Sequence, residues 1–76
     1  MNMETALNYK DRDKRLITGY MTRVGDSVEV TDILEKSGAE RMRVYPIIQE
    51  MILEGQIEVI ETEELGAPKA VKFSGK

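Results

Sequence analysis

The order of apolar and polar residues along the chain predicts helices first and a β-hairpin afterwards. From Asp11 onward the apolar residues recur at the spacing of one face of an α-helix, which predicts a first helix from about Asp11 to Arg23. They are Leu16, Ile17, Tyr20, Met21 and Val24. Gly25 and Asp26 end this predicted first helix. Residues 1–10 carry little pattern, and we interpret them as an N-terminal arm that is loose or partly helical.

The next segments are short. In "SVEV", residues 27–30, two valines alternate with polar residues, as in a half-buried strand. A second helix is predicted in "TDILEKSG", where Thr31 or Asp32 caps the start and Gly38 ends it. Ile33 and Leu34 are its predicted core residues.

A third helix is predicted from about Glu40 to Glu54, and Gly55 ends it. Val44, Ile47, Ile48 and Met51 share its core face. Pro46 falls inside this segment, where a proline costs about 3 kcal/mol unless the helix is just beginning. We therefore expect either an irregular first turn or a regular helix that starts only around Val44.

A β-hairpin follows the third helix. In "QIEVIE" and "KAVKF" apolar residues alternate with polar ones, and turn-forming residues stand between the two segments. The predicted core-facing residues are Ile57, Val59, Val71 and Phe73, with a loose tip over residues 63–68.

The predicted fold is α+β: a winged helix over residues 11–76, with a three-helix core, a short strand and a two-stranded wing. From Thr31 to Ile60 the chain resembles the winged helix-turn-helix family of bacterial transcription regulators. Within it, "VYPIIQEM" followed by "EG" is similar to the Tyr-Pro signature of PadR-like regulators, which lies near the start of the recognition helix. The sequence shows no counterpart of the helical dimerisation segment that usually follows the wing in those regulators.

The resemblance implies a transcription regulator that binds double-stranded DNA, usually as a dimer. Its third helix would be the recognition helix, and the candidate base-reading residues are Arg41, Arg43, Tyr45 and Gln49. Lys69 and Lys72 are candidates for contacts of the wing with the DNA backbone. The same residues are also compatible with an ordinary solvated helix face.

Charge weakens the DNA hypothesis. The 76-residue chain has a net charge of −3, and seven acidic residues oppose Arg41 and Arg43 between Glu40 and Glu64. We therefore expect only weak electrostatic attraction to DNA. Lys10, Arg12, Lys14 and Arg15 form a basic cluster, but two aspartates interrupt it, which is typical of a solvated helix face.

Apolar residues on the third helix, opposite its core face, indicate an alternative function. Met42, Pro46 and Leu53, with Ile52 at their flank, lie opposite its core face, where a solvated helix should be polar. Either the arm covers them through Met3, Leu7 or Tyr9, or they contact a second copy or another protein. The alternative function is therefore a winged-helix protein-interaction module that does not bind DNA.

Composition argues against catalysis. The chain has no cysteine and no histidine, which removes the usual zinc ligands and nucleophile-base pairs. We expect no enzyme activity, no cofactor and no metal site, and the acidic group around Glu61, Glu63 and Glu64 lacks the spacing of a calcium loop. No apolar run is long enough to cross a membrane and no secretory signal is evident, so a cytoplasmic location is expected.

Overall fold

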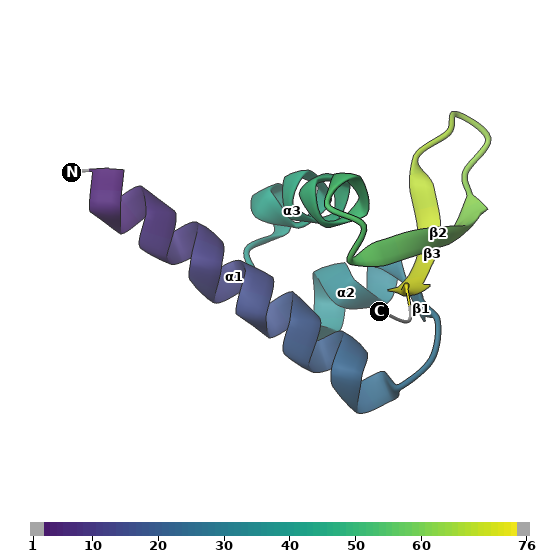
Figure 1. Ribbon diagram of the computed structural model, residues 1–76, viewed down its shortest axis with the longest axis horizontal. Coiled ribbons are helices and arrows are strands. Elements are labelled where there is room, and N and C mark those ends of the chain that lie inside the picture. The colour runs from purple at the N-terminus through teal and green to yellow at the C-terminus, as the bar shows by residue number, and fades with distance from the viewer. Residues whose placement is uncertain (1–2, 75–76) are drawn as a thin grey trace.

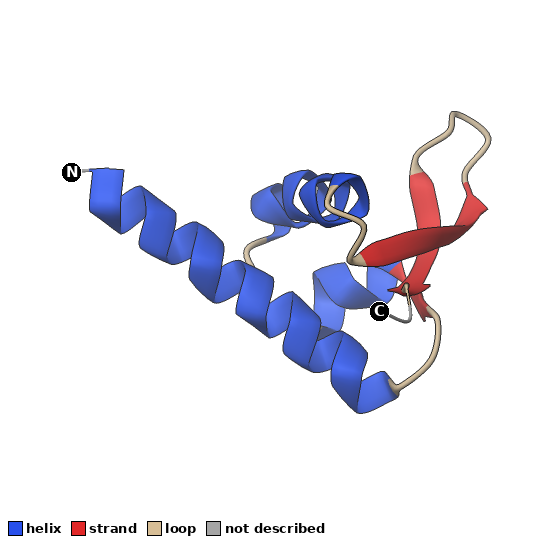
Figure 2. Cartoon of the chain, viewed as in Figure 1, coloured by secondary structure: helices blue, strands red, loops and turns tan. Residues whose placement is uncertain are grey.

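The protein consists of three helices and a three-stranded antiparallel sheet (Figures 1 and 2). The structure is a computed structural model that describes residues 3–74, with side chains described from residue 9 onward. The elements are α1 (Met3–Val24), β1 (Val28–Glu29), α2 (Val30–Lys36), α3 (Arg41–Leu53), β2 (Ile57–Thr62) and β3 (Pro68–Phe73). The predicted α+β class and order of elements are confirmed.

The three strands pair in the order β1-β3-β2. Val71 on β3 is opposite Val28 of β1 on one side and Val59 of β2 on the other. The hairpin register shifts between Val59 and Glu61, so Ile60 has no partner of its own on β3. Of the four hairpin residues predicted to face the core, Ile57 and Val71 are buried, whereas Val59 and Phe73 are partly exposed.

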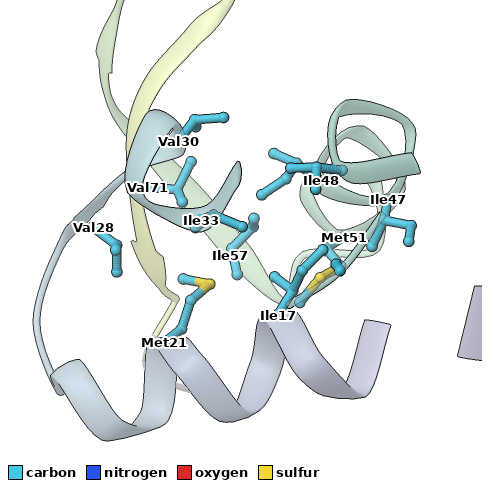
Figure 3. Close-up of a cluster of buried hydrophobic side chains, with 12 residues drawn as sticks. Ile17, Met21, Val28, Val30, Ile33, Ile47, Ile48, Met51, Ile57 and Val71 are labelled. Atoms are coloured by element: carbon cyan, nitrogen blue, oxygen red, sulfur yellow. The ribbon is translucent and has the colours of Figure 1, made fainter. Parts of the chain in front are cut away.

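The hydrophobic core lies where α1, α2 and α3 meet the sheet (Figure 3). All four residues predicted for the core face of α3 are buried, namely Val44, Ile47, Ile48 and Met51. Among the side chains of α1 that the structure describes, from residue 9 onward, the apolar core includes Ile17 and Met21, while Leu16 and Val24 are partly exposed and Tyr20 packs at the margin. The predicted apolar stripe of α1 was therefore too wide, because one narrow line of its residues faces the core.

Helix α1 is longer than predicted and begins at Met3 rather than near Asp11. Residues 3–10, expected as an arm, are continuous with the rest of the helix and extend past α3 in Figure 1. The buried stripe that contains Ile17 and Met21 extends back to Asp13, which is also fully buried. A charged residue at a core-facing position hid this part of the helix from a pattern based on apolar residues.

The predicted cap of α2 is wrong. The N-cap is Glu29, whose side chain makes no capping hydrogen bond, and Thr31 and Asp32 lie inside the helix. Strand β1 ends at Glu29, so Val30 is already helical. A four-residue turn separates α2 from α3, and Gly38, which was predicted to end the second helix, adopts a φ of +86° within it.

The expectation for Pro46 is also wrong. Helix α3 is regular from Arg41, and Glu40 caps it by accepting a hydrogen bond from the Met42 N–H at 2.9 Å. Pro46 is the sixth residue of this helix, beyond the first turn, where the missing N–H is no longer harmless. Because Pro46 cannot donate, the carbonyl of Met42 lacks its usual helical partner.

Candidate interaction surface on the third helix

The outward face of α3 is largely apolar. Met42 is 82% exposed and Leu53 is 86% exposed, and Pro46 and Gln49 between them are also exposed. These four residues are spaced by four, three and four positions and form one stripe along the helix, which we call the α3 stripe. It lies opposite the buried face that contains Ile48 and Met51. The predicted apolar surface is therefore exposed, except that Ile52 is half-buried against the core.

A polar line runs beside the α3 stripe. Arg41, Tyr45 and Gln49 follow one another at intervals of four residues, and all three are exposed. Arg41 makes no hydrogen bond or ion pair with any side chain in the described part of the chain. Three of the four predicted base-reading residues therefore face solvent together.

The fourth, Arg43, is bound to α1 instead. Its Nε donates a hydrogen bond to Asp13 Oδ2 at 2.5 Å, and its guanidinium lies over the ring of Tyr9, 5.5 Å from the centroid. Arg12 contacts the same aspartate at 3.3 Å and the same ring at 5.5 Å. Asp13 is thus a buried carboxylate between two arginines. Sequence reasoning missed Asp13, although its position four residues before Ile17 places it on the same helix face.

The charge state of Asp13 follows from these contacts. Burial by itself raises the pKa of Asp13, because it disfavours the charged form. The hydrogen bonds and positive charges of Arg43 and Arg12 outweigh burial and hold the pKa below its usual value. Asp13 is therefore ionised at neutral pH and holds Arg43 at the α1–α3 interface.

Part of the predicted basic cluster is also paired with α3. Lys10 Nζ donates to Glu50 Oε1 at 2.7 Å, and Lys14 Nζ donates to Glu54 Oε1 at 3.0 Å. The hydrogen bond with Lys10 lowers the pKa of Glu50, and burial opposes that effect only in part. These lysines are thus engaged within the molecule rather than presented freely to a phosphate backbone.

The hairpin carries mostly negative charge. Lys72 pairs with Glu58 across the strands at 3.7 Å, and Lys69 is exposed on β3. These two lysines are the candidate contacts to a DNA backbone, but the same hairpin also exposes Glu61, Glu63 and Glu64. At the tip, Leu65 is 98% exposed. The hairpin as a whole therefore repels a phosphate backbone more than it attracts one.

The arm hypothesis names Met3, Leu7 and Tyr9 as the residues that cover the α3 stripe. The side chains of Met3 and Leu7 lie outside the described residues. Tyr9 lies against Arg12 and Arg43, on the flank of α3 that faces α1, and not over Met42. With Met42 and Leu53 both more than four-fifths exposed, Tyr9 does not cover the stripe.

A shallow groove lies between α1, the C-terminal end of α3 and the C-terminal end of β3. Its lining includes Asp11, Lys14, Arg15, Thr18, Glu54 and Phe73. Both signs of charge alternate there, and two of these groups, Lys14 and Glu54, pair with each other. The groove therefore shows no charge preference for a ligand, in contrast to the α3 stripe, which is apolar except for Gln49.

Comparison with known proteins gives no match, whether with family models, curated proteins or solved structures. Across the part of the chain that the structure describes, every helix is too short or too polar to traverse a lipid bilayer.

Proposed function

We propose that the chain is a winged-helix module that binds another protein through the exposed face of α3. The order of its elements supports the winged-helix assignment: two helices joined by a four-residue turn, followed by a hairpin that pairs with a short strand. In this assignment α2 and α3 form the helix-turn-helix, and β2 with β3 forms the wing. Because a fold does not determine a function, the function is argued from the surface of α3.

The observation that carries the proposal is the exposure of Met42 and Leu53. Two large apolar side chains that are both more than 80% exposed on one helix face favour burial against an apolar partner. The edges of DNA bases are polar apart from the thymine methyl group, so an apolar stripe gains little in the major groove. A protein surface, in contrast, offers complementary apolar area.

The distribution of charge supports the same function. Asp13 of α1 forms an ion pair with Arg43. Near the end of α3, Glu50 pairs with Lys10 and Glu54 pairs with Lys14. Affinity for duplex DNA depends mainly on cations that neutralise phosphates, and few exposed cations border α3. The acidic hairpin next to α3 further lowers the attraction.

DNA binding remains the second candidate, favoured by the polar line of Arg41, Tyr45 and Gln49. Arg pairs well with guanine and Gln with adenine, and all three side chains are exposed near one another on the helix that a winged-helix regulator inserts into the groove. The two candidates share Gln49 but otherwise use different residues of the same helix, so variants of Met42 and of Arg41 separate them.

A photo-crosslinking residue placed at position 42 in the expressed full chain tests the proposal. The same residue at position 65 is the matched control, because Leu65 is equally apolar and even more exposed but lies at the hairpin tip. We expect a protein adduct at position 42 and none at position 65. A nucleic-acid adduct at position 42, together with duplex binding at 50 mM salt that Arg41→Ala abolishes, would overturn the proposal in favour of DNA binding.

A further inference from the structure

We propose that the partner of the α3 stripe is a second copy of this chain, whose α3 packs antiparallel against the first. This inference rests on the proposed function and names its partner. The stripe of Met42, Pro46, Gln49 and Leu53 has the four-three-four spacing by which two helices pack along a common seam. An antiparallel pair centred between Ile47 and Ile48 sets Met42 of each copy against Leu53 of the other, and Pro46 against Gln49.

The helix dipoles favour this orientation. The charges on one flank of α3 do not decide it, because they are already paired with α1: Arg43 with Asp13, Glu50 with Lys10, and Glu54 with Lys14. A parallel pair would align both helix N-termini, each with an exposed Arg41, and these would repel each other. An antiparallel pair instead sets the N-terminus of each helix beside the C-terminus of the other, which is the favourable arrangement.

The hairpin adds a second complementary contact. In Figure 1 it rises beyond the C-terminal end of α3, on the side away from α1 and α2. A helix laid antiparallel on α3 brings its positive N-terminal end, with the exposed Arg41, toward this hairpin. The hairpin carries Glu61 and Glu63, both exposed. The proposed dimer thus provides an acidic partner for Arg41, which forms no ion pair within the described part of the molecule.

Pro46 gives a third reason. The carbonyl of Met42 lacks its helical donor because Pro46 has no N–H, and both residues are exposed, so this carbonyl lies along the stripe. In the proposed pair, Gln49 of the second copy is level with Pro46, and its flexible amide can donate to the carbonyl of Met42. Two-fold symmetry makes this contact twice. Gln49, the one polar residue of the stripe, thereby acquires a partner when the stripe is buried.

The interface is small. A 13-residue helix is about 20 Å long, so a single helix pair buries less surface than a standard permanent interface. We therefore expect a reversible, concentration-dependent dimer rather than an obligate one.

Sedimentation velocity of the full chain between 10 µM and 1 mM, on the order of the concentrations at which weak dimers form, tests the inference. We expect the parent chain to shift from monomer to dimer over this range. Met42→Glu and Leu53→Lys should each raise the dimer dissociation constant at least tenfold, because each buries a charge against an apolar side chain. Leu65→Lys, an equally exposed leucine at the hairpin tip, should leave dimerisation unchanged.

The double variant Met42→Glu with Leu53→Lys tests the orientation. In the antiparallel pair each new glutamate faces a new lysine, so dimerisation should recover, whereas a parallel pair would set like charges together and lose it further. Glutamate near the start of a helix and lysine near its end both agree with the helix dipole, so we expect each variant to fold, and circular dichroism checks this.

Several outcomes would overturn the inference. A chain that stays monomeric throughout, or a dimer that both single variants leave intact, excludes the second copy as the partner. If the chain is monomeric while a different protein is crosslinked at position 42, the inference fails and the proposed function stands. A nucleic-acid adduct at that position overturns both.

Discussion

Asp13 on α1 and Arg43 on α3 form a hydrogen-bonded ion pair across thirty residues of sequence, with Nε of the arginine 2.5 Å from Oδ2 of the aspartate. The aspartate is fully buried, whereas the arginine side chain keeps 39% of its surface exposed. The pair fixes the start of α3 against α1 and removes Arg43 from the surface that a recognition helix would present. One contact therefore bears on both the stability and the function of α3.

Asp13→Ala should reduce the free energy of unfolding by on the order of 1 to 2 kcal/mol. The variant loses hydrogen bonds to a charged group, but Arg43 can still turn to water, so the loss stays below that of a fully buried pair. Urea unfolding measures the change. Asp11→Ala, at an exposed position on the same helix, is the control and should change stability by within about 0.5 kcal/mol. Equal effects of the two variants would contradict a structural role for Asp13.

The pH dependence of stability should also report on Asp13. Its pKa in the folded chain lies below the usual value of 3.8, so its contribution is present above that value and is lost as pH falls through the folded-state pKa. Asp13→Asn keeps the shape and cannot ionise. The stability difference between the parent and Asp13→Asn should therefore be largest at neutral pH and shrink below about pH 4. Urea midpoints measured from pH 7 to pH 3 test this expectation, and a constant difference would contradict it.

The sequence predicted the core side of α3 correctly because helical periodicity depends on local geometry alone. Ile47, Ile48 and Met51 had to share a face once the segment was helical, and all three are buried. The partner of Arg43 could not be predicted in the same way. It depends on how α1 crosses α3, and a buried aspartate reads as a solvent-facing residue in any pattern that counts apolar positions.

The candidate site was predicted only in part for the same reason. Helical spacing places Met42 and Leu53 opposite the core face, but whether the arm covers them could not be decided from spacing; both are exposed. The sequence did not predict that α3 is regular from Arg41. The side chain of Glu40 caps the helix by accepting a hydrogen bond from the Met42 N–H, so the helix begins well before Pro46. Which lysines and arginines form ion pairs also depends on how the helices pack together. Lys14 of α1, for example, pairs with Glu54 at the end of α3.

Two glycines should respond to alanine in opposite directions. Gly19 lies inside α1, with open space around the position of an added Cβ, so Gly19→Ala should stabilise the chain by about 0.5 to 1 kcal/mol. Gly38 has a φ of +86° in the turn before α3, so Gly38→Ala should destabilise it by about 1 to 2 kcal/mol. Thermal unfolding of both variants gives the signs. Destabilisation by Gly19→Ala would mean that another molecule occupies the space beside α1.

Ile48 and Leu53 lie on opposite faces of α3, so replacing each with alanine should change the stability of the monomer by different amounts. Ile48 is fully buried, so Ile48→Ala should cost about 2 to 5 kcal/mol through lost packing and a residual cavity. Leu53→Ala removes a side chain that is largely exposed in the monomer and should change its stability by less than about 0.5 kcal/mol. Urea unfolding at low micromolar protein compares the two variants. A large loss at Leu53 under these conditions would mean that the monomer itself covers the α3 stripe.

Pro46→Ala should stabilise the monomer by about 1 to 3 kcal/mol. Alanine restores the N–H that donates to the carbonyl of Met42, removes the clash of the ring with that turn, and leaves no cavity because Pro46 is exposed. Urea unfolding of dilute protein measures the gain, with Leu53→Ala as the control at an exposed position of the same helix. A change smaller than about 0.5 kcal/mol would mean that the helix relaxes around the proline at little cost.

The same substitution should weaken the dimer. Once the N–H of alanine occupies the carbonyl of Met42, Gln49 of the second copy loses the acceptor that the proposed pair provides, and burial of its amide becomes unfavourable. Pro46→Ala should therefore raise the unfolding free energy of the monomer and, in sedimentation velocity, raise the dimer dissociation constant. A gain in monomer stability combined with a loss of dimer affinity distinguishes a proline retained for self-association from one that is merely tolerated, because replacing a tolerated proline would leave dimerisation unchanged.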